Sequence, residues 1–218
     1  IEHPLYAGGH LGVAKIDDLN DARFDFPRVL EETFSLFKEL GIERERVPLI
    51  PAGGIASPAQ VRELFALGAS AVQVGTPFAV TEESDAHPNF KRVLADADPE
   101  DIITFMSVAG LPARAVKTPW LEQYLAKLPV LPRRAKPRPG CTPAFDCLEQ
   151  CGLRDGNPLF GQFCIDHHLA AALAGDVKRG LFFRGAGPLP FGKQIRPVSD
   201  LIEYLLNSTM PTESLKAG

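Results

Sequence analysis

The sequence predicts an α/β fold, in which parallel strands alternate with helices packed outside them. Two short apolar runs, 47–55 and 69–74, have the length and composition of buried strands. Each run ends in a glycine-containing loop, and the segments that follow, 59–68 and 82–95, are expected to be helices. This strand–loop–helix order, repeated once, indicates the fold class.

Further elements are expected on both sides of this unit. Residues 27–40 carry apolar side chains at helical spacing, and Gly41 provides a stop. Ser57 is an N-cap candidate because Pro58 follows it at the first helical position. The remaining expected elements are helices over 99–106, 165–179 and 198–206, with Ser199 as the N-cap candidate of the last, and a short strand over 180–185.

Composition excludes several classes of protein. Hydrophobic residues make up 45% and charged residues 23% of the 218 positions, so the chain can bury a core. The net charge of −4 argues against general nucleic-acid binding, which needs a basic face. No apolar run reaches the about 20 residues of a membrane-spanning helix, and no signal peptide is visible. The few, clustered cysteines suggest a reducing compartment, so we expect a cytoplasmic protein with no membrane or nucleic-acid partner.

Glycine-rich loops follow both predicted strands. The first contains Gly53 and Gly54, and the second consists of Gln73, Val74, Gly75 and Thr76. Glycine lets the backbone approach an anion closely, and free N–H groups at the next helix start complement its charge. A single glycine-containing loop of this kind is typical of an ordinary turn. Two at successive parallel strand ends indicate a phosphate site.

A third glycine-rich segment carries the candidate catalytic side chain. His10 follows Gly8 and Gly9 directly, and Gly12 comes two residues later. Its imidazole can titrate near neutral pH, as a general base requires. The alternative interpretation is a histidine that only hydrogen-bonds a loop carbonyl.

The sequence resembles the nitronate monooxygenase family, formerly called 2-nitropropane dioxygenases, in four ordered motifs: AGGHLG (7–12), PAGGIAS (51–57), LGASAVQVGTPFAVTEESDAHPNFK (67–91) and GLPARAVKTP (110–119). The same framework is similar to FMN-dependent enoyl-ACP reductases and to some FMN-dependent NADH:quinone reductases. The cysteines and the segment GLFFRGAG (180–187) resemble a subgroup with a Cys-containing extension.

The resemblance implies an FMN-binding TIM-type (β/α)₈ barrel and a flavin oxidoreductase. Both glycine loops would hold the FMN phosphate, and Gly8 and Gly9 would lie close to the flavin ring. His10 matches the family's catalytic histidine, whereas Tyr6 replaces an acidic or small residue. The implied reaction is the FMN-dependent oxidation of alkyl nitronates by molecular oxygen to a carbonyl compound and nitrite.

The resemblance also divides the chain. Residues 1–128 are expected to form the C-terminal half of the barrel, 129–143 a Pro-rich basic linker and 144–218 a Cys-containing helical extension. A complete barrel usually takes about 250 residues. We therefore expect a fragment, a cleavage product or the partner of a separate N-terminal half, with weak FMN binding on its own and an open oligomeric state.

Four cysteines fall between positions 141 and 164. They are Cys141, Cys147, Cys151 and Cys164. Their spacing matches neither the paired knuckles of a zinc ribbon nor a ferredoxin run. Buried free thiols are the favoured interpretation, and a zinc ion or an iron–sulfur cluster is the alternative.

Two other functions stay open at this point. The first is an NAD(P)H-dependent flavin reductase of enoyl thioesters or quinones, which the same scaffold would support. The second is an inactive barrel fragment or a Cys-based metal-binding module.

Overall fold

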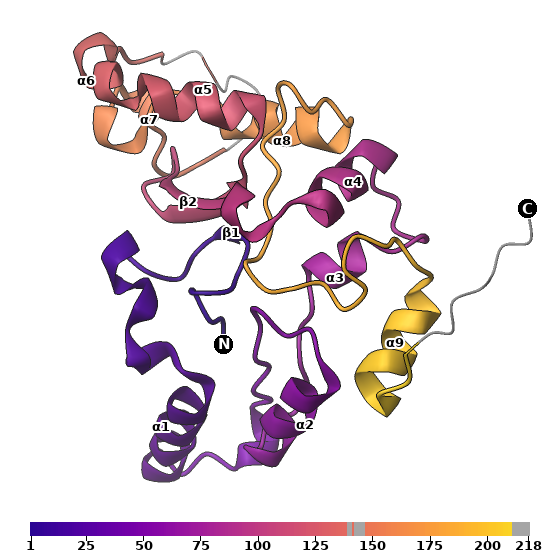
Figure 1. The fold of residues 1–218 in the computed structure, drawn as a ribbon. Coiled ribbons are helices and arrows are strands. Elements are labelled where there is room, and N and C mark those ends of the chain that lie inside the picture. The colour runs from indigo at the N-terminus through magenta and orange to yellow at the C-terminus, as the bar shows by residue number, and fades with distance from the viewer. Residues whose placement is uncertain (139–140, 142–146, 211–218) are drawn as a thin grey trace, which may run out of the picture.

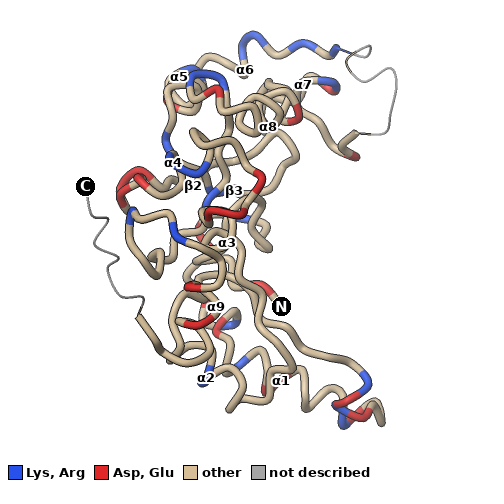
Figure 2. Tube along the Cα trace, turned by 90° about the vertical axis from the view of Figure 1, so that its right-hand side faces the viewer, with Lys and Arg blue, Asp and Glu red and all other residues tan. Residues whose placement is uncertain are grey.

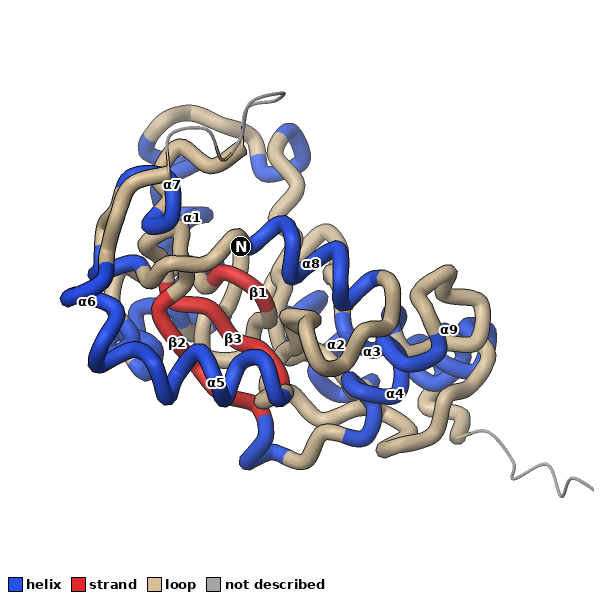
Figure 3. The backbone as a smooth tube through the Cα atoms, turned by 90° about the horizontal axis from the view of Figure 1, so that it is seen from above, coloured by secondary structure: helices blue, strands red, loops and turns tan. Residues whose placement is uncertain are grey.

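A three-stranded antiparallel sheet lies near the middle of the molecule (Figures 1 and 3). The computed structural model describes residues 1–138, 141 and 147–210. The strand order is β1-β3-β2, with β1 at Gly9–His10, β2 at Ile102–Met106 and β3 at Pro112–Val116. All five residues of β3 are buried because β3 is the central strand. Figure 3 shows the three strands side by side.

The helix expected over 99–106 is wrong. Only a short 3₁₀ turn, Pro99–Asp101, forms there, and β2 follows it immediately. The run begins with β-branched Ile102, Ile103 and Thr104, which favour extended backbone. Pairing with β3, a strand that the local pattern does not indicate, then fixes the extended form.

The two predicted parallel strands do run parallel, but their pairing is short. Isolated parallel bridges join Ala52 to Glu2 on one side and to Gln73 on the other. Pro48 and Pro51 interrupt the first run, and proline has no N–H to donate to a ladder. The backbone N–H of Gln73 donates to the Pro51 carbonyl at 2.8 Å. The segments therefore pair in the expected order without forming regular strands.

Five of the expected helices are present, with corrected ends. They are α1 (Phe26–Glu39), α2 (Pro58–Ala66), α4 (Pro88–Asp96), α8 (Ile165–Leu173) and α9 (Val198–Asn207). The Ser57 hydroxyl accepts the N–H of Gln60 at 3.3 Å, which confirms the predicted N-cap. Helix α4 begins later than expected because the His87 side chain caps it. Helix α9 begins after Pro197, so the N-cap prediction for Ser199 is wrong.

Short helical segments complete the described chain. The α-helical ones are α3 (Thr76–Ala79), α5 (Pro119–Lys127), α6 (Leu131–Arg134) and α7 (Gly152–Asp155). The other 3₁₀ turns are Ile16–Asn20, Ala22–Phe24, Arg44–Arg46, Leu128–Val130 and Pro158–Phe160. The segment 129–143 was expected to be an extended Pro-rich linker, but its first residues form helical turns, Leu128–Val130 and Leu131–Arg134. Exposed cations follow along 133–138, beside α6 (Figure 2).

Two large clusters of buried apolar side chains hold the fold together. One joins α1, α2 and α9 through side chains such as Leu30, Val61 and Leu201. The other joins β2 and β3 to α5 and to the 151–181 region. The expected strand at 180–185 contributes one antiparallel bridge, from Phe183 to Ala115. Within the described ranges, no helix combines the length and apolar character needed to cross a membrane.

Candidate active site in the glycine-rich cleft

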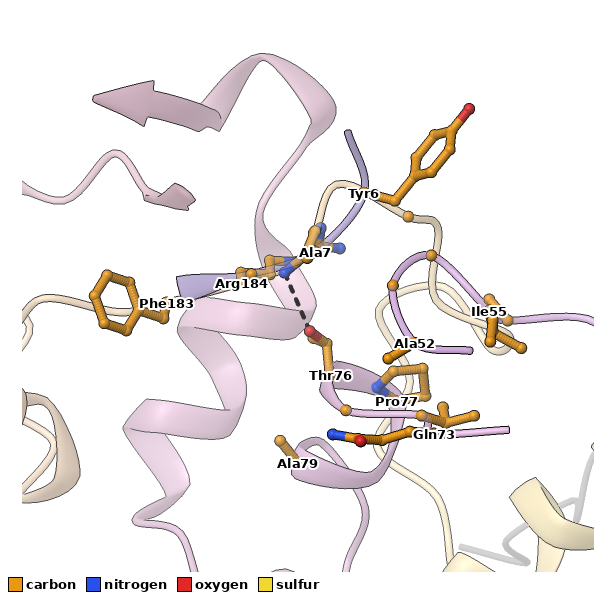
Figure 4. A pocket seen from close by; sticks show the side chains of 18 of the residues that line it. Tyr6, Ala7, Ala52, Ile55, Gln73, Thr76, Pro77, Ala79, Phe183 and Arg184 are labelled. Carbon is orange, nitrogen blue, oxygen red and sulfur yellow. Dashed lines mark hydrogen bonds between the residues drawn. The ribbon is translucent and has the colours of Figure 1, made fainter. Parts of the chain in front are cut away.

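A cleft of about 280 Å³ lies at the end of the parallel ladder (Figure 4). The predicted binding residues that line it are Gly8, Gly53, Gly54, Gln73, Val74, Gly75 and Thr76. The bridge between Ala52 and Gln73 explains why the two loops meet, because the carboxyl ends of parallel strands share one edge. Ligands of open α/β sheets bind at this edge.

The first loop requires glycine at both positions. Gly53 has φ of +102° and Gly54 has φ of +74°, a region that other L-residues rarely adopt. A Cβ atom on Gly53 would lie 2.9 Å from the His3 carbonyl oxygen. One on Gly54 would lie 2.6 Å from the Tyr6 Cβ. The loop is therefore a close-packed turn whose backbone faces the cleft without a side chain.

The second loop has a different geometry. A Cβ atom on Gly75 would meet nothing within 4 Å, so protein atoms leave the space beside this residue open. The Thr76 hydroxyl oxygen accepts the N–H of Gly185 at 3.2 Å, a bond drawn in Figure 4. A hydroxyl that accepts one bond still has its own proton to donate. The second loop thus offers an open space and a free hydroxyl donor.

Backbone donors of both loops remain free. Among the described residues, the N–H groups of Gly53, Gly54, Gly75 and Thr76 donate to no backbone or side-chain acceptor. Consecutive backbone N–H groups that converge on a concave surface form an anion-binding site. The cleft therefore has the donor set that a phosphate group needs.

A third wall, which was not predicted from the sequence, is formed by Phe183, Arg184, Gly185, Gly187 and Pro188. A Cβ atom on Gly8 would lie 2.5 Å from the backbone of Arg184 and Gly185. One on Gly187 would lie 3.0 Å from the Gly54 Cα. Glycine is thus needed where the third wall touches the other loops. The signal that could have found it was the pair Gly185 and Gly187, separated from the aromatic run Phe182-Phe183 only by Arg184.

His10 lies beside the cleft and does not line it. Its ring centroid is 5.9 Å from that of Phe183, which is a lining residue. Gly9 also lies outside the lining, and a Cβ atom there would be 3.7 Å from the Phe183 ring. Phe183 therefore contacts both the cleft and the β1 strand that carries His10.

Burial and one serine define the state of His10. The His10 Nε2 atom lies 2.8 Å from the hydroxyl oxygen of Ser107, a fully buried residue. That oxygen also accepts the N–H of Ala109 at 3.1 Å. Burial lowers the pKa of His10 below its ordinary value. Burial therefore favours the neutral imidazole, which is the form that can accept a proton.

A comparison with known protein families identifies the family of this chain. The nitronate monooxygenase family model matches residues 4–208. The chain belongs to the nitronate monooxygenase family. The resemblance seen in the four sequence motifs is thereby confirmed.

Individual members of the nitronate monooxygenase family match shorter stretches. A Bacillus subtilis protein named "Probable nitronate monooxygenase" is 35% identical over 77 residues, which cover 35% of this chain and 22% of that protein. A nitronate monooxygenase of Paraburkholderia phytofirmans is 33% identical over 112 residues, which cover 51% of this chain and 28% of that protein.

Solved structures match almost the whole chain. FabK from Thermotoga maritima superimposes with a TM-score of 0.61 at 26% identity, over 94% of this chain and 51% of FabK. The nitroalkane oxidase from Streptomyces ansochromogenes superimposes with a TM-score of 0.53 at 25% identity, over 91% of this chain and 48% of the oxidase. The chain thus spans about half the length of these proteins and less of the curated relatives.

Tyr6, the position at which the sequence departs from the nitronate monooxygenase family motif, lines the cleft. Its side chain is 42% exposed and packs against the His3 ring. Glu2 also lines the cleft, and burial raises the pKa of its carboxyl. Both residues therefore contribute to the cleft wall, and Tyr6 does so at the position where the resemblance implied an acidic or small residue.

The cysteines lie apart from the cleft. All four are free thiols; Cys151 is buried, and the others are half-buried. The Cys151 sulfur accepts the N–H of Arg154 at 3.5 Å at the start of α7. Among the residues that the structure describes, no group of three or more His, Cys, Asp or Glu could hold a metal ion. The zinc or iron–sulfur alternative thus gains no support, and residues 142–146 of this segment lie outside the described part.

Proposed function

We propose that this chain binds FMN in the glycine-rich cleft and takes part in the oxidation of alkyl nitronates by molecular oxygen to a carbonyl compound and nitrite. The convergence of both glycine loops on one cleft, with His10 at its side, carries the proposal. Membership of the nitronate monooxygenase family supports it. The names of the matched relatives point to the same class of substrate.

The cleft fits the phosphate end of FMN. Backbone N–H groups of Gly53 and Gly54 are free on one side, and Gly75 leaves open space on the other. The Thr76 hydroxyl can donate because the N–H of Gly185 occupies only a lone pair of its oxygen. These groups would bind the phosphate oxygens, and a side chain at Gly53, Gly54 or Gly75 would obstruct them.

His10 supplies the proton chemistry of the proposed reaction. As a neutral imidazole, it would accept the proton from the carbon next to the nitro group of a neutral nitroalkane. With a nitronate as substrate no proton is removed, and an N–H of the neutral ring would instead hydrogen-bond a nitronate oxygen. Ser107 holds the ring through Nε2, and the Phe183 ring packs beside it. A bound flavin would supply the electron acceptor.

The test compares the chain with a His10→Gln variant. Each protein is given saturating FMN and either an alkyl nitronate or the neutral nitroalkane, and oxygen uptake and nitrite release are measured together. We expect the wild-type chain to consume oxygen and release nitrite with either substrate. In the variant, the turnover rate of the neutral nitroalkane should fall about 100-fold. FMN binding should stay the same, because His10 does not line the cleft.

Two results would contradict the proposal. The first is a bound flavin that NADH reduces without oxygen while the nitronate is left unchanged, which would favour the NAD(P)H-dependent reductase. The second is equal turnover of the neutral nitroalkane by the wild-type chain and the variant, which would remove His10 from the reaction. The metal-module alternative and the division into barrel half, linker and extension stay predictions.

A further inference from the structure

Arg184 is a buried cation beside the cleft. Its residue surface is 5% exposed, and it lines both the glycine-rich cleft and an adjoining cavity of about 300 Å³. No carboxylate of the described residues lies within 4.0 Å of its guanidinium. Burial lowers the pKa of this group. A buried charge without an opposite charge is costly, so an arginine here needs an explanation.

Two carbonyl groups account for part of its hydrogen bonding. The Nε atom donates to the Leu94 carbonyl at 2.7 Å, in the last turn of α4. The Nη1 atom donates to the Gly185 carbonyl at 2.8 Å. These bonds fix the plane of the guanidinium. Carbonyl dipoles do not neutralise a full positive charge, which is left for another partner.

The Nη2 atom of Arg184 is still available. It donates to no acceptor among the described residues, although a guanidinium has five N–H donors. Among the described residues, His3 Nδ1 is the only fully buried side-chain nitrogen or oxygen without a hydrogen-bond partner. Because Nη2 of Arg184 also lacks a partner, it is not fully buried. Nη2 therefore reaches accessible space, and the spaces that Arg184 lines are the cleft and the adjoining cavity.

The neighbouring residues connect Arg184 to the phosphate loops. The next residue, Gly185, donates its N–H to the Thr76 hydroxyl at 3.2 Å. The Arg184 carbonyl carbon packs so closely on Gly8 that only glycine fits there. Among the residues that line the cleft, the only other charged side chain is the carboxylate of Glu2. Arg184 is thus the cation of the cleft lining.

We propose that Arg184 supplies the positive charge that selects a dianionic phosphate monoester in the cleft. This inference rests on the proposed function, because FMN carries such a group at the end of its ribityl chain. The glycine loops would bind the phosphate oxygens through the backbone, and Arg184 would stabilise the charge. A flavin without phosphate would gain nothing from Arg184.

The test compares FMN with riboflavin, which has the same ring and ribityl chain but no phosphate. Quenching of flavin fluorescence gives the dissociation constants for the wild-type chain, Arg184→Gln and Arg184→Lys. We expect Arg184→Gln to weaken FMN binding about tenfold or more and to change riboflavin binding less than about twofold. Arg184→Lys should lose less, because it retains the charge without the planar fork.

A matched control is Arg92→Gln. Arg92 is an exposed arginine of α4 that pairs with Asp96 at 3.5 Å and does not line the cleft. This variant should bind both flavins like the wild-type chain. Inorganic phosphate should compete with FMN in the wild-type chain and much less in Arg184→Gln.

The outcomes separate this inference from the proposed function. A wild-type chain that binds neither flavin contradicts the proposed function and, with it, the inference. A wild-type chain that prefers FMN, together with an Arg184→Gln variant that keeps the same preference, overturns the inference alone. If thermal melting shows that Arg184→Gln is unfolded, Arg184→Met, which keeps a long apolar side chain without the charge, takes its place. An unchanged preference of this variant for FMN over riboflavin overturns the inference.

Discussion

The His10 Nε2 atom and the Ser107 hydroxyl oxygen lie 2.8 Å apart, although 97 positions separate the two residues in the chain. The antiparallel sheet brings them together: His10 pairs with Ala113 of β3, and Ser107 follows β2 in the turn that leads to β3. The turn is closed by a bond from the Gly110 N–H to the Ser107 carbonyl at 3.1 Å. The candidate catalytic ring is thus oriented by a residue that the sequence motifs do not contain.

Replacing Ser107 with alanine tests this orientation. We expect Ser107→Ala to lower turnover of a neutral nitroalkane about tenfold or more, because small misplacements of a catalytic group are costly. Its dissociation constant for FMN should not change. Ser70→Ala, at an exposed serine, is the control and should leave turnover unchanged. Steady-state rates with unaltered affinity for FMN provide the check, and equal rates in the two variants would show that the Ser107 hydroxyl has no positioning role.

The pH profile of activity should follow the state of His10. Burial holds its pKa below the ordinary value of 6.5, so the ring loses its proton at a lower pH than a solvated histidine. Turnover of a neutral nitroalkane requires the neutral base, and it should rise with pH to a plateau with an inflection below 6.5. A rate that is still rising between pH 7 and 8 would mean that another group is the base.

Stability should fall in acid for the same physical reason. Burial lowers the folded-state pKa of His3, His10 and His168 below the ordinary 6.5. The unfolded chain therefore binds more protons at a given pH, and the free energy of unfolding should decrease as pH falls from 6.5 through the folded-state values. Urea denaturation at several pH values measures this slope. His10→Gln should show a shallower slope than the wild-type chain.

The two glycine loops should respond differently to alanine. Gly53→Ala forces an alanine to φ of +102° with a Cβ atom 2.9 Å from a carbonyl oxygen, so we expect a loss of at least about 1–2 kcal/mol in the free energy of unfolding. Gly75→Ala puts a methyl group into open space and should leave stability nearly unchanged. It should nevertheless weaken FMN binding, because that space is where the phosphate would lie. Urea titrations and flavin affinities of both variants distinguish the roles, and undiminished FMN binding by Gly75→Ala would place the phosphate elsewhere.

The cysteines should behave as thiols. We expect the purified, reduced chain to contain less than stoichiometric zinc or iron, because the described part offers no metal-ligand group. Thiol titration without denaturant should label Cys151 last, since it is buried in the core beside Phe163. One zinc or iron per chain in elemental analysis would instead favour a metal site that includes residues outside the described ranges.

Local signals in the sequence predicted the local features of the fold well. The cap at Ser57 and the helix stop at Gly41 depend on neighbouring residues, and the structure has them where expected. The glycine loops were predictable because only glycine adopts the backbone that such turns require. Contacts between positions far apart in the chain were harder to predict. The 102–106 segment, for example, is a strand because it pairs with β3.

The third wall of the cleft illustrates the same limit for the site. Arg184 is more than a hundred residues from Thr76 in the chain. Nothing in the sequence around Arg184 predicts that its guanidinium is buried without a carboxylate partner. Its place follows from the single bridge of Phe183 to β3, a contact that no local periodicity indicates. Ser107 was missed for the same reason, as its partner is fixed by the sheet.

The central claim is that the two glycine loops hold the phosphate of FMN, and amide NMR of the labelled chain tests it most directly. On titration with FMN, we predict chemical-shift changes concentrated at the backbone amides of Gly53, Gly54, Gly75, Thr76 and Gly185. Riboflavin should produce much smaller changes at these positions. Changes that are confined to other regions, or that are equal for FMN and riboflavin at these amides, would contradict the account.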